Sequence, residues 1–307
     1  MDLRVFVEPQ YGATYADQLA MAQAAERLGF DAFFRSDHFM AFGANPLPGP
    51  TDSWVTLAAI ARETSTIRLG TMVTSATFRP PGLLAVQVAQ ADEMSGGRVE
   101  LGLGAGWFQA EHEAYGFLFP PTLSERFERL AEQLEIVTGL WGTPIGETYS
   151  FAGRHYSLSG GPALPKPVQS PLPVIVGGLG PRKTVALAAR FAQEINVPWV
   201  DPATTREQFA RVRAACEANG RDPDSIVLGH AINVTCDRDE TRALARAEAL
   251  GLPPLLAANA ATGTPEQVVE TLQGYAAVGA TRSYLQLVDL HDLEHLELIA
   301  AEVLPHL

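Results

Sequence analysis

The sequence of 307 residues contains only two cysteines, Cys216 and Cys236, which is too few for a disulfide framework. Neither lies in a motif that would activate a thiol, so we interpret both as buried thiols rather than nucleophiles. No apolar run approaches the ~20 residues of a membrane-spanning helix. Asp2 and Arg4 precede only a short strand-like run, so no signal peptide is expected. These absences predict a cytoplasmic protein without a membrane span.

Positive charge is scarce as well. Lysine and arginine number 22 against 35 acidic residues, and the formal net charge is −13. This balance argues against nucleic acid as the main partner, because a polyanion would be repelled. An anionic cofactor would need a local site of backbone N–H groups and a few cations. The hydrophobic fraction of 47% is ample for a buried core, so we expect a globular protein and not a disordered one.

The motifs of several common hydrolases are missing. The sequence has no Gly-x-Ser-x-Gly elbow and no Walker-type Gly-Lys-Ser/Thr. The first apolar run ends in Glu8-Pro9-Gln10, where metal-dependent barrel hydrolases carry His-x-His. Glu111-His112-Glu113 lacks the two-histidine i, i+4 spacing, and nothing nearby completes a ligand set. We therefore predict no metal site, and expect His112 to order its loop or to contact substrate.

What the sequence does contain is a regular alternation of short apolar runs and amphipathic stretches. The predicted strands are Leu3–Val7, Asp31–Arg35, Ile67–Thr74, Val99–Leu103, Val174–Val176, Glu194–Val197, Ile226–Val234 and Ser283–Leu287. The predicted helices are Tyr15–Leu28, Asp52–Thr64, Leu83–Met94, Ser124–Leu140, Pro181–Phe191, Thr204–Asn219, Glu240–Leu250, Pro265–Val278 and Leu293–Leu304. Eight strand–helix units predict a (β/α)8 TIM barrel, with a doubly wound parallel sheet as the alternative.

One segment breaks this alternation. Glu147–Leu158 has the pattern of a hairpin, and Pro162–Pro173 is too rich in proline for a regular helix. We interpret residues 141–172 as an insertion after the fourth strand–helix unit, not as a linker. The whole chain, 1–307, is then a single barrel domain.

The most informative stretch runs from Arg98 to Trp107. It begins as an apolar strand and ends in glycines at alternate positions, Gly102, Gly104 and Gly106, followed by Trp107. Glycine lets a ligand approach the backbone closely, and an aromatic residue after such a turn can wall a flat ligand. A Rossmann-type dinucleotide turn is disfavoured, because the spacing is Gly-x-Gly-x-Gly rather than Gly-x-Gly-x-x-Gly.

In a barrel the chemistry belongs on the loops that follow the strands. Asp37-His38 follows the second strand, where a carboxylate beside an imidazole can serve acid–base chemistry or bind a ligand. The alternative for this dipeptide is a solvated turn with a capping aspartate. Thr71–Ser75 closes the third strand, and a buried strand with a polar end accounts for it equally well.

A second glycine-rich loop has the features of an anion site. Gly177, Gly178 and Gly180 free backbone N–H groups at a helix N-terminus, where the helix dipole also favours negative charge. Arg182 and Lys183 add positive charge that this acidic chain otherwise lacks locally. The alternative is a tight strand–helix turn with surface cations.

Taken together and in order, these motifs resemble one family, the bacterial luciferase-like flavin and deazaflavin barrels. The resemblance is closest to the branch of oxidoreductases that depend on coenzyme F420. The matching stretches are Arg35–His38, Ser53–Leu57, Ile67–Thr74, Glu93–Trp107, Glu111–Gly116, Val174–Gly180 and Gly263–Val269. They span nearly the whole chain.

The resemblance implies roles for individual residues. Asp37 and His38 match residues beside the reacting ring of the deazaflavin. Met72-Val73 matches a non-proline cis peptide that forms a bulge behind that ring, and Thr74 matches a hydroxyl that bonds its pyrimidine side. Residues implied to line the ring and the phosphate arm are Gly104, Ala105, Gly106 and Trp107. Residues implied to hold the phosphate and the negative tail are Gly177, Gly178, Leu179, Gly180, Arg182 and Lys183.

The insertion at 141–172 matches one that partly covers the site in this family, whose members are typically homodimers. Two departures from the family pattern matter. Leu179 interrupts what are often three consecutive glycines at the phosphate loop. Gly106-Trp107 stands where the sugar-phosphate dehydrogenases of the family have an acidic residue, which argues against a sugar phosphate as substrate.

The expected activity is hydride transfer between coenzyme F420 and a small organic substrate, with Asp37 and His38 beside the reacting carbon. One alternative is a two-component monooxygenase that uses FMN, and another is a cofactor-binding protein without catalysis. Trp54, Trp107 and Phe78 are candidate walls of the substrate pocket, and ordinary core packing is the alternative for each.

Overall fold

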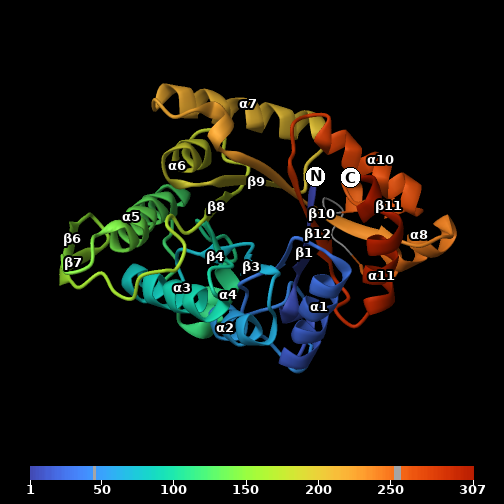
Figure 1. Ribbon diagram of the computed structural model, residues 1–307, viewed down its shortest axis with the longest axis horizontal. Coiled ribbons are helices and arrows are strands. Elements are labelled where there is room, and N and C mark those ends of the chain that lie inside the picture. The colour runs from blue at the N-terminus through green and yellow to red at the C-terminus, as the bar shows by residue number, and fades with distance from the viewer. Residues whose placement is uncertain (44–45, 252–256) are drawn as a thin grey trace.

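The computed structural model describes residues 1–43, 46–251 and 257–307. Eight parallel strands form a closed barrel within helices (Figure 1). The barrel strands are β1 (Asp2–Val7), β2 (Ala32–Arg35), β3 (Arg68–Thr71), β5 (Val99–Gly104), β8 (Val174–Gly177), β9 (Glu194–Pro198), β10 (Val227–Cys236) and β12 (Arg282–Leu287). They follow one another around the barrel in this order, and β12 pairs with β1 to close it. The prediction of a (β/α)8 barrel is confirmed, and the doubly wound alternative is wrong.

Helices pack around the strands (Figure 1). They are α1 (Tyr15–Leu28), α2 (Ser53–Glu63), α3 (Pro81–Ser95), α4 (Gln109–Tyr115), α5 (Leu123–Gly142), α6 (Lys183–Phe191), α7 (Pro202–Ala218), α8 (Glu240–Ala249), α10 (Pro265–Ala276) and α11 (Leu293–Glu302). The boundaries follow local chemistry. In α1, Thr14 and Asp17 form a reciprocal capping box, and Gly29 ends the helix at φ +88°. None of the helices in the described ranges is long and apolar enough to cross a membrane.

Three local expectations differ from the structure. The third strand is interrupted at Met72-Val73, after which β4 (Thr74–Ser75) pairs with β5. The cap of α5 is Thr122, whose side chain accepts from the Glu125 N–H, so the helix begins at Leu123 and not at the predicted Ser124. Helix α4 and strand β11 (Ala261–Gly263) were not predicted, because segments this short carry too few residues to show a period.

The inward-facing side chains form layers along the barrel. At the amino ends of the strands lies an ion-pair network made by Arg4, Arg68, Glu100, Glu194 and Arg282. Above it is an apolar layer made by Phe6, Ala32, Phe34, Met72, Ile175, Ala231 and Tyr284. These two layers fill the barrel, so a ligand has room only at the carboxyl ends of the strands.

The insertion contains a hairpin, β6 (Tyr149–Ala152) and β7 (Ser157–Gly161), which lies beside α5 at the edge of the molecule (Figure 1). The Glu132 carboxylate on α5 accepts from three consecutive backbone N–H groups of the hairpin turn, residues 154–156. The return segment runs past the amino ends of the strands, where Gln169 donates to the Val99 carbonyl. These contacts tie the insertion to α5 and to the far end of the barrel.

Candidate functional site

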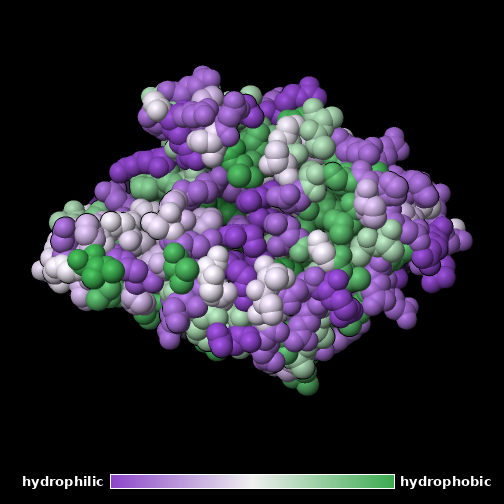
Figure 2. Space-filling model, viewed as in Figure 1, coloured by the Kyte–Doolittle hydropathy of each residue, from purple (hydrophilic) through white to green (hydrophobic). Residues whose placement is uncertain are grey.

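The predicted site residues gather at the carboxyl ends of the barrel strands. In the space-filling view a hollow lies near the centre of the molecule, with hydrophilic residues prominent around it (Figure 2). The loops after β2, β4 and β5 and the loop between β8 and α6 supply the residues that the sequence singled out. Their surroundings decide which of them face a ligand.

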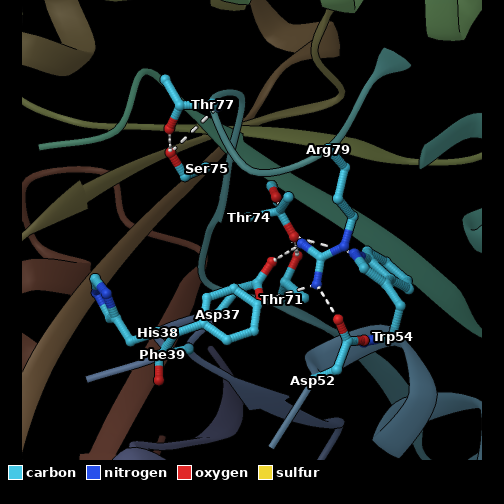
Figure 3. Close-up of polar contacts among 12 residues, drawn as sticks. Asp37, His38, Phe39, Asp52, Trp54, Thr71, Thr74, Ser75, Thr77 and Arg79 are labelled. Atoms are coloured by element: carbon cyan, nitrogen blue, oxygen red, sulfur yellow. Dashed lines mark hydrogen bonds and ion pairs between the residues drawn. The ribbon is translucent and has the colours of Figure 1, made fainter. Parts of the chain in front are cut away.

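The carboxylate of Asp37 forms a buried ion pair. Its carboxylate oxygens lie 2.5 and 3.2 Å from two nitrogens of Arg79, whose guanidinium also lies 2.6 Å from Asp52 (Figure 3). Burial alone would raise the pKa of Asp37, but the charge of Arg79 and its hydrogen bonds outweigh burial and lower that pKa. Asp52 in turn caps α2 by accepting from the N–H groups of Trp54 and Val55. The ionised Asp37 therefore fixes the loop after β2 to the start of α2.

His38 points away from this ion pair (Figure 3) and toward a different carboxylate. Its Nδ1 lies 3.0 Å from Glu111, which also accepts from the Phe39 N–H at 2.9 Å. Burial favours the neutral ring, but the Glu111 hydrogen bond and charge prevail and raise the pKa of His38. Among the described residues, no hydrogen-bond partner is found for Nε2, and 17% of the side chain is exposed. This nitrogen is free to exchange a proton with a ligand.

Three aromatic rings pack around the imidazole of His38. The rings of Phe42, Trp107 and Phe108 meet its imidazole edge-on, with centroids 5.1 to 6.3 Å away. Trp107 stacks on Phe108 and is 62% exposed, so it lines the surface and not the core. An exposed indole beside an available imidazole can form an apolar wall for a small ligand.

The Met72-Val73 peptide is cis, as the family resemblance implied. The glycines of β5 make room for the bulge that contains it. A Cβ added to Gly102 would overlap the Thr71 carbonyl oxygen, and one added to Gly104 would lie 2.8 Å from Val73. Our interpretation of these two glycines as an approach for a ligand is therefore incomplete, because both are needed for strand packing.

Gly106 differs from the other two glycines of this turn. Its φ of +80° lies in the left-handed region, and a Cβ there would lie 2.8 Å from the Thr77 hydroxyl. Ala105, next to it, is half-buried and packs against the main core. The turn therefore has a fixed shape that presents Trp107 to the outside.

The hydroxyl groups after β3 are largely used inside the protein. The Trp54 Nε1–H donates to Thr74 Oγ1 at 3.1 Å, and that hydroxyl donates to Thr71 at 3.2 Å (Figure 3). Trp54 and Thr74 are both buried. Phe78 is also buried and packs against Phe39. Of the three candidate pocket walls, Trp54 and Phe78 thus belong to the core, and only Trp107 is exposed.

His112 orders the loop after β5. It lies 2.7 Å from the Phe108 carbonyl through Nδ1 and 2.6 Å from the Thr77 hydroxyl through Nε2. Since the carbonyl can only accept, Nδ1 carries the proton and Nε2 accepts from Thr77. Burial lowers the pKa of His112, which keeps the ring neutral. No group of metal-binding side chains is present within the described ranges.

The loop from Gly177 to Gly180 leads into α6 as predicted, but part of it is occupied by internal contacts. The Gly178 N–H donates to the Asn196 carbonyl at 3.0 Å, and Gly178 has a φ of +133°. Lys183 donates to Ser124 at 2.8 Å, whereas Arg182 is exposed and forms no ion pair with another described residue. Leu179 is exposed at the tip of the loop.

Sequence reasoning gave no role to a polar layer at the barrel mouth. The Gln286 side-chain amide donates to Glu8 at 2.7 Å and accepts from the Trp199 indole at 2.9 Å. Gln10 donates to the other oxygen of Glu8 and accepts from Ser36 at 2.7 Å. The only sequence signal for this layer was the presence of polar residues at the end of an apolar strand.

The partners of Asp37 and His38 were missed as well. Arg79 stands before two prolines, and Glu111 stands in a stretch that was weighed as a metal site and matched to the family without a role for Glu111 itself. A buried arginine needs a carboxylate partner, but the sequence does not say which one.

Comparison with known proteins gives the family. A model of the luciferase-like monooxygenase family matches residues 3–254. The chain belongs to the luciferase-like monooxygenase family. It is 32% identical over 229 residues to an F420-dependent glucose-6-phosphate dehydrogenase of Microbacterium testaceum, covering 72% of this chain and 64% of that relative. It is 30% identical over 297 residues to the pyrimidine monooxygenase RutA of Stutzerimonas stutzeri, covering 92% of this chain and 75% of that relative.

Solved structures of the family share the fold. An F420-dependent secondary alcohol dehydrogenase, in complex with an F420–acetone adduct, superposes with a TM-score of 0.86 at 20% identity, covering 99% of this chain and 98% of that one. Both the dehydrogenases and the monooxygenases among these relatives are oxidoreductases, in agreement with the predicted enzyme class.

Proposed function

We propose that this member of the family is an oxidoreductase that moves a hydride between coenzyme F420 and a small organic substrate. The observation that carries the proposal is the His38–Glu111 pair at the mouth of the barrel. Its free Nε2 lies beside an exposed aromatic wall. The similarity to F420-dependent relatives supports this choice of cofactor.

The residues present fit a flat anionic cofactor. The side chain of Val73 in the bulge fills the space beside Gly104 and Gly177, where an added Cβ would lie 2.8 and 3.2 Å from it. The loop at the start of α6 offers the positive end of a helix dipole, and the unpaired Arg182 lies beside it. When bound, F420 supplies or accepts the hydride.

The protein's own contribution is proton transfer and positioning. Because Glu111 favours the protonated ring, His38 can give a proton from Nε2 to an atom that gains negative charge. In the reverse direction the neutral ring takes that proton back. Asp37 acts at a distance, since its ion pair with Arg79 holds the loop that carries His38. Trp107 shields the reacting atoms from water on one side.

The test is a pair of fluorescence titrations of the purified protein, one with F420 and one with FMN. Saturable binding of F420 with weaker binding of FMN is the expected result. A preference for FMN would replace the proposal with the second candidate, an FMN-dependent monooxygenase, which the similarity to RutA over 92% of the chain favours. Binding of F420 without turnover of any carbonyl, alcohol or enone tested would favour a non-catalytic cofactor-binding protein.

Assembly as a homodimer and a location in the cytoplasm also belong to the proposal. Apolar residues on the outer faces of α2 and α3, among them Val55, Leu83 and Val86, are exposed in the single chain. A face of this kind is typical of a contact between subunits.

A further inference from the structure

An unpartnered amide lies in the wall of the barrel mouth. Asn233 is on β10, on the same strand face as Gly229 and Ala231. Ala231 belongs to the apolar layer inside the barrel, so Asn233, two residues further along, faces inward above that layer. The register pairs Asn233 with Gln286, which places its side chain at the level of the polar layer.

Asn233 is only 2% exposed, yet neither its Nδ2 nor its Oδ1 has a hydrogen-bond partner among the described residues. A buried amide without partners destabilises a fold, because it loses its bonds to water and gains none. The neighbouring Gln286 and Glu8 are satisfied by each other and by Trp199 and Gln10. Asn233 thus presents an open donor and an open acceptor side by side.

The position of Asn233 separates it from the elements proposed to hold the cofactor. In the closed ring of eight strands, β10 lies four strands away from β3, so it faces the Met72-Val73 bulge from across the barrel. The phosphate loop follows β8, two strands from β10. A cofactor seated on the bulge and this loop leaves the wall around Asn233 to the substrate.

The charges of this wall restrict which chemical groups of a substrate can bind there. Among the described residues, no arginine or lysine forms an ion pair with Glu8. Arg35 and His38 are close enough to interact electrostatically with Glu8, but neither forms an ion pair with it. An anionic group such as a phosphate, placed against Glu8, would therefore meet a carboxylate that no ion pair neutralises. Glu8 already accepts from two amides, so the groups left open are the neutral donor and acceptor of Asn233.

We propose that Asn233 is a specificity-determining residue that binds an uncharged carboxamide-type group of the substrate, in which an N–H and a C=O stand side by side. The inference rests on the proposed function, because it assumes that the cofactor binds at the opposite wall of the barrel mouth. The two amides pair through two hydrogen bonds, Nδ2–H to the substrate carbonyl and the substrate N–H to Oδ1.

The experiment measures the binding of three small probes to the F420-loaded protein by ligand-observed NMR titration. The probes are δ-valerolactam, which has both the donor and the acceptor, cyclohexanone, which has only the acceptor, and piperidine, which is a cation. They are tested on the wild type, on Asn233→Leu, which has a similar volume and no hydrogen bonds, and on Asn233→Asp. Asn219→Leu, at the exposed end of α7, is the matched control.

The lactam is expected to bind the wild type and the control best and to lose about tenfold or more of its affinity in both Asn233 variants. The melting temperature of Asn233→Leu should stay the same or rise, since the variant removes an unpaired buried amide. Absence of lactam binding, equal binding to wild type and Asn233→Leu, or stronger binding of piperidine would overturn the inference.

Cofactor affinity, measured in the same variants, separates the two proposals. If Asn233→Leu weakens F420 instead of the lactam, Asn233 belongs to the cofactor site and the inference is wrong. If the wild type binds neither F420 nor FMN, the proposed function fails, and the same probe titrations on the free protein still decide whether Asn233 pairs with a carboxamide.

Discussion

At the scale of single residues, the two neighbours Asp37 and His38 have different partners. The carboxylate of Asp37 is paired with Arg79, whereas His38 has one ring nitrogen without a hydrogen-bond partner among the described residues and lies beside Trp107. In the proposed function, a dipeptide that looked like one acid–base unit is therefore divided between positioning and proton transfer. The division follows from where the two side chains point, which is opposite directions on one short loop (Figure 3).

This division predicts distinct effects of substitution. Replacing His38 with alanine should lower turnover roughly 100-fold or more while cofactor affinity changes little, because a positioned acid or base contributes at this level. Steady-state kinetics with cofactor titrations would measure both quantities. An equal loss of cofactor affinity would show that His38 acts in binding instead.

Glu111 favours the protonated form of His38. In Glu111→Gln the pKa of His38 should fall, because the carboxylate no longer stabilises the imidazolium. The pH above which proton donation is lost should then move down by the same amount. NMR titration of the His38 ring and the pH–rate profile should agree, and an unchanged pKa would contradict the role of Glu111. Glu113→Gln, on the exposed side of the same helix, is the control.

At the scale of elements, the bulge after β3 and the glycines of β5 form one packing unit. Gly102→Ala should destabilise the protein by about 3 kcal/mol or more, since the new Cβ would overlap the Thr71 carbonyl and the backbone would have to move. Gly82→Ala is the matched control, because nothing lies within 4 Å of its added Cβ. Chemical denaturation of both variants would measure the difference, and equal stabilities would refute the packing role.

A buried histidine makes the contact between β10 and α10 sensitive to acid. His230 stacks on Tyr275 with ring centroids 4.0 Å apart, and neither ring nitrogen has a hydrogen-bond partner among the described residues. Burial lowers the pKa of His230 to about 3. The unfolded chain, with a pKa of about 6.5, binds more protons between these two values. Stability therefore falls as the pH drops from about 6.5 toward 3, by at most roughly 1.4 kcal/mol per pH unit.

His230→Phe should remove the part of this dependence that His230 causes, so that acid unfolding begins at a lower pH than in the wild type, while the buried His295, whose pKa burial lowers to about 4, keeps its own contribution. Urea denaturation at several pH values would show it. His306→Phe, at an exposed position, should unfold as the wild type does. A His230 variant with an unaltered pH dependence would show that the ring does not titrate on unfolding.

At the scale of the whole molecule, the barrel leaves exposed apolar residues on the outer faces of α2 and α3. If that face is the contact of a homodimer, the wild type should have a mass near twice 32.9 kDa in light scattering. Val55→Asp and Leu83→Asp should reduce it to one subunit. Ile145→Asp, at an equally exposed apolar residue of the insertion, should leave the mass unchanged. A wild type with the mass of one chain would contradict the dimer.

The sequence by itself determined the barrel, because eight apolar runs separated by amphipathic helices have few other ways to bury their hydrophobic faces. It also determined that the polar residues of the site follow the strands, and the family pattern located the cis peptide after β3. These features are local or periodic, so they can be read along the chain.

Only the tertiary structure decided how those residues are used. Arg79 stands 42 residues from Asp37, and Glu111 stands 73 residues from His38, so each pair exists only because the barrel brings separate loops together. The burial of Trp54 and the open amide of Asn233 depend in the same way on distant neighbours. Hydrogen bonds and ion pairs act over a few ångströms in space, and that proximity is set by the packing of the whole barrel.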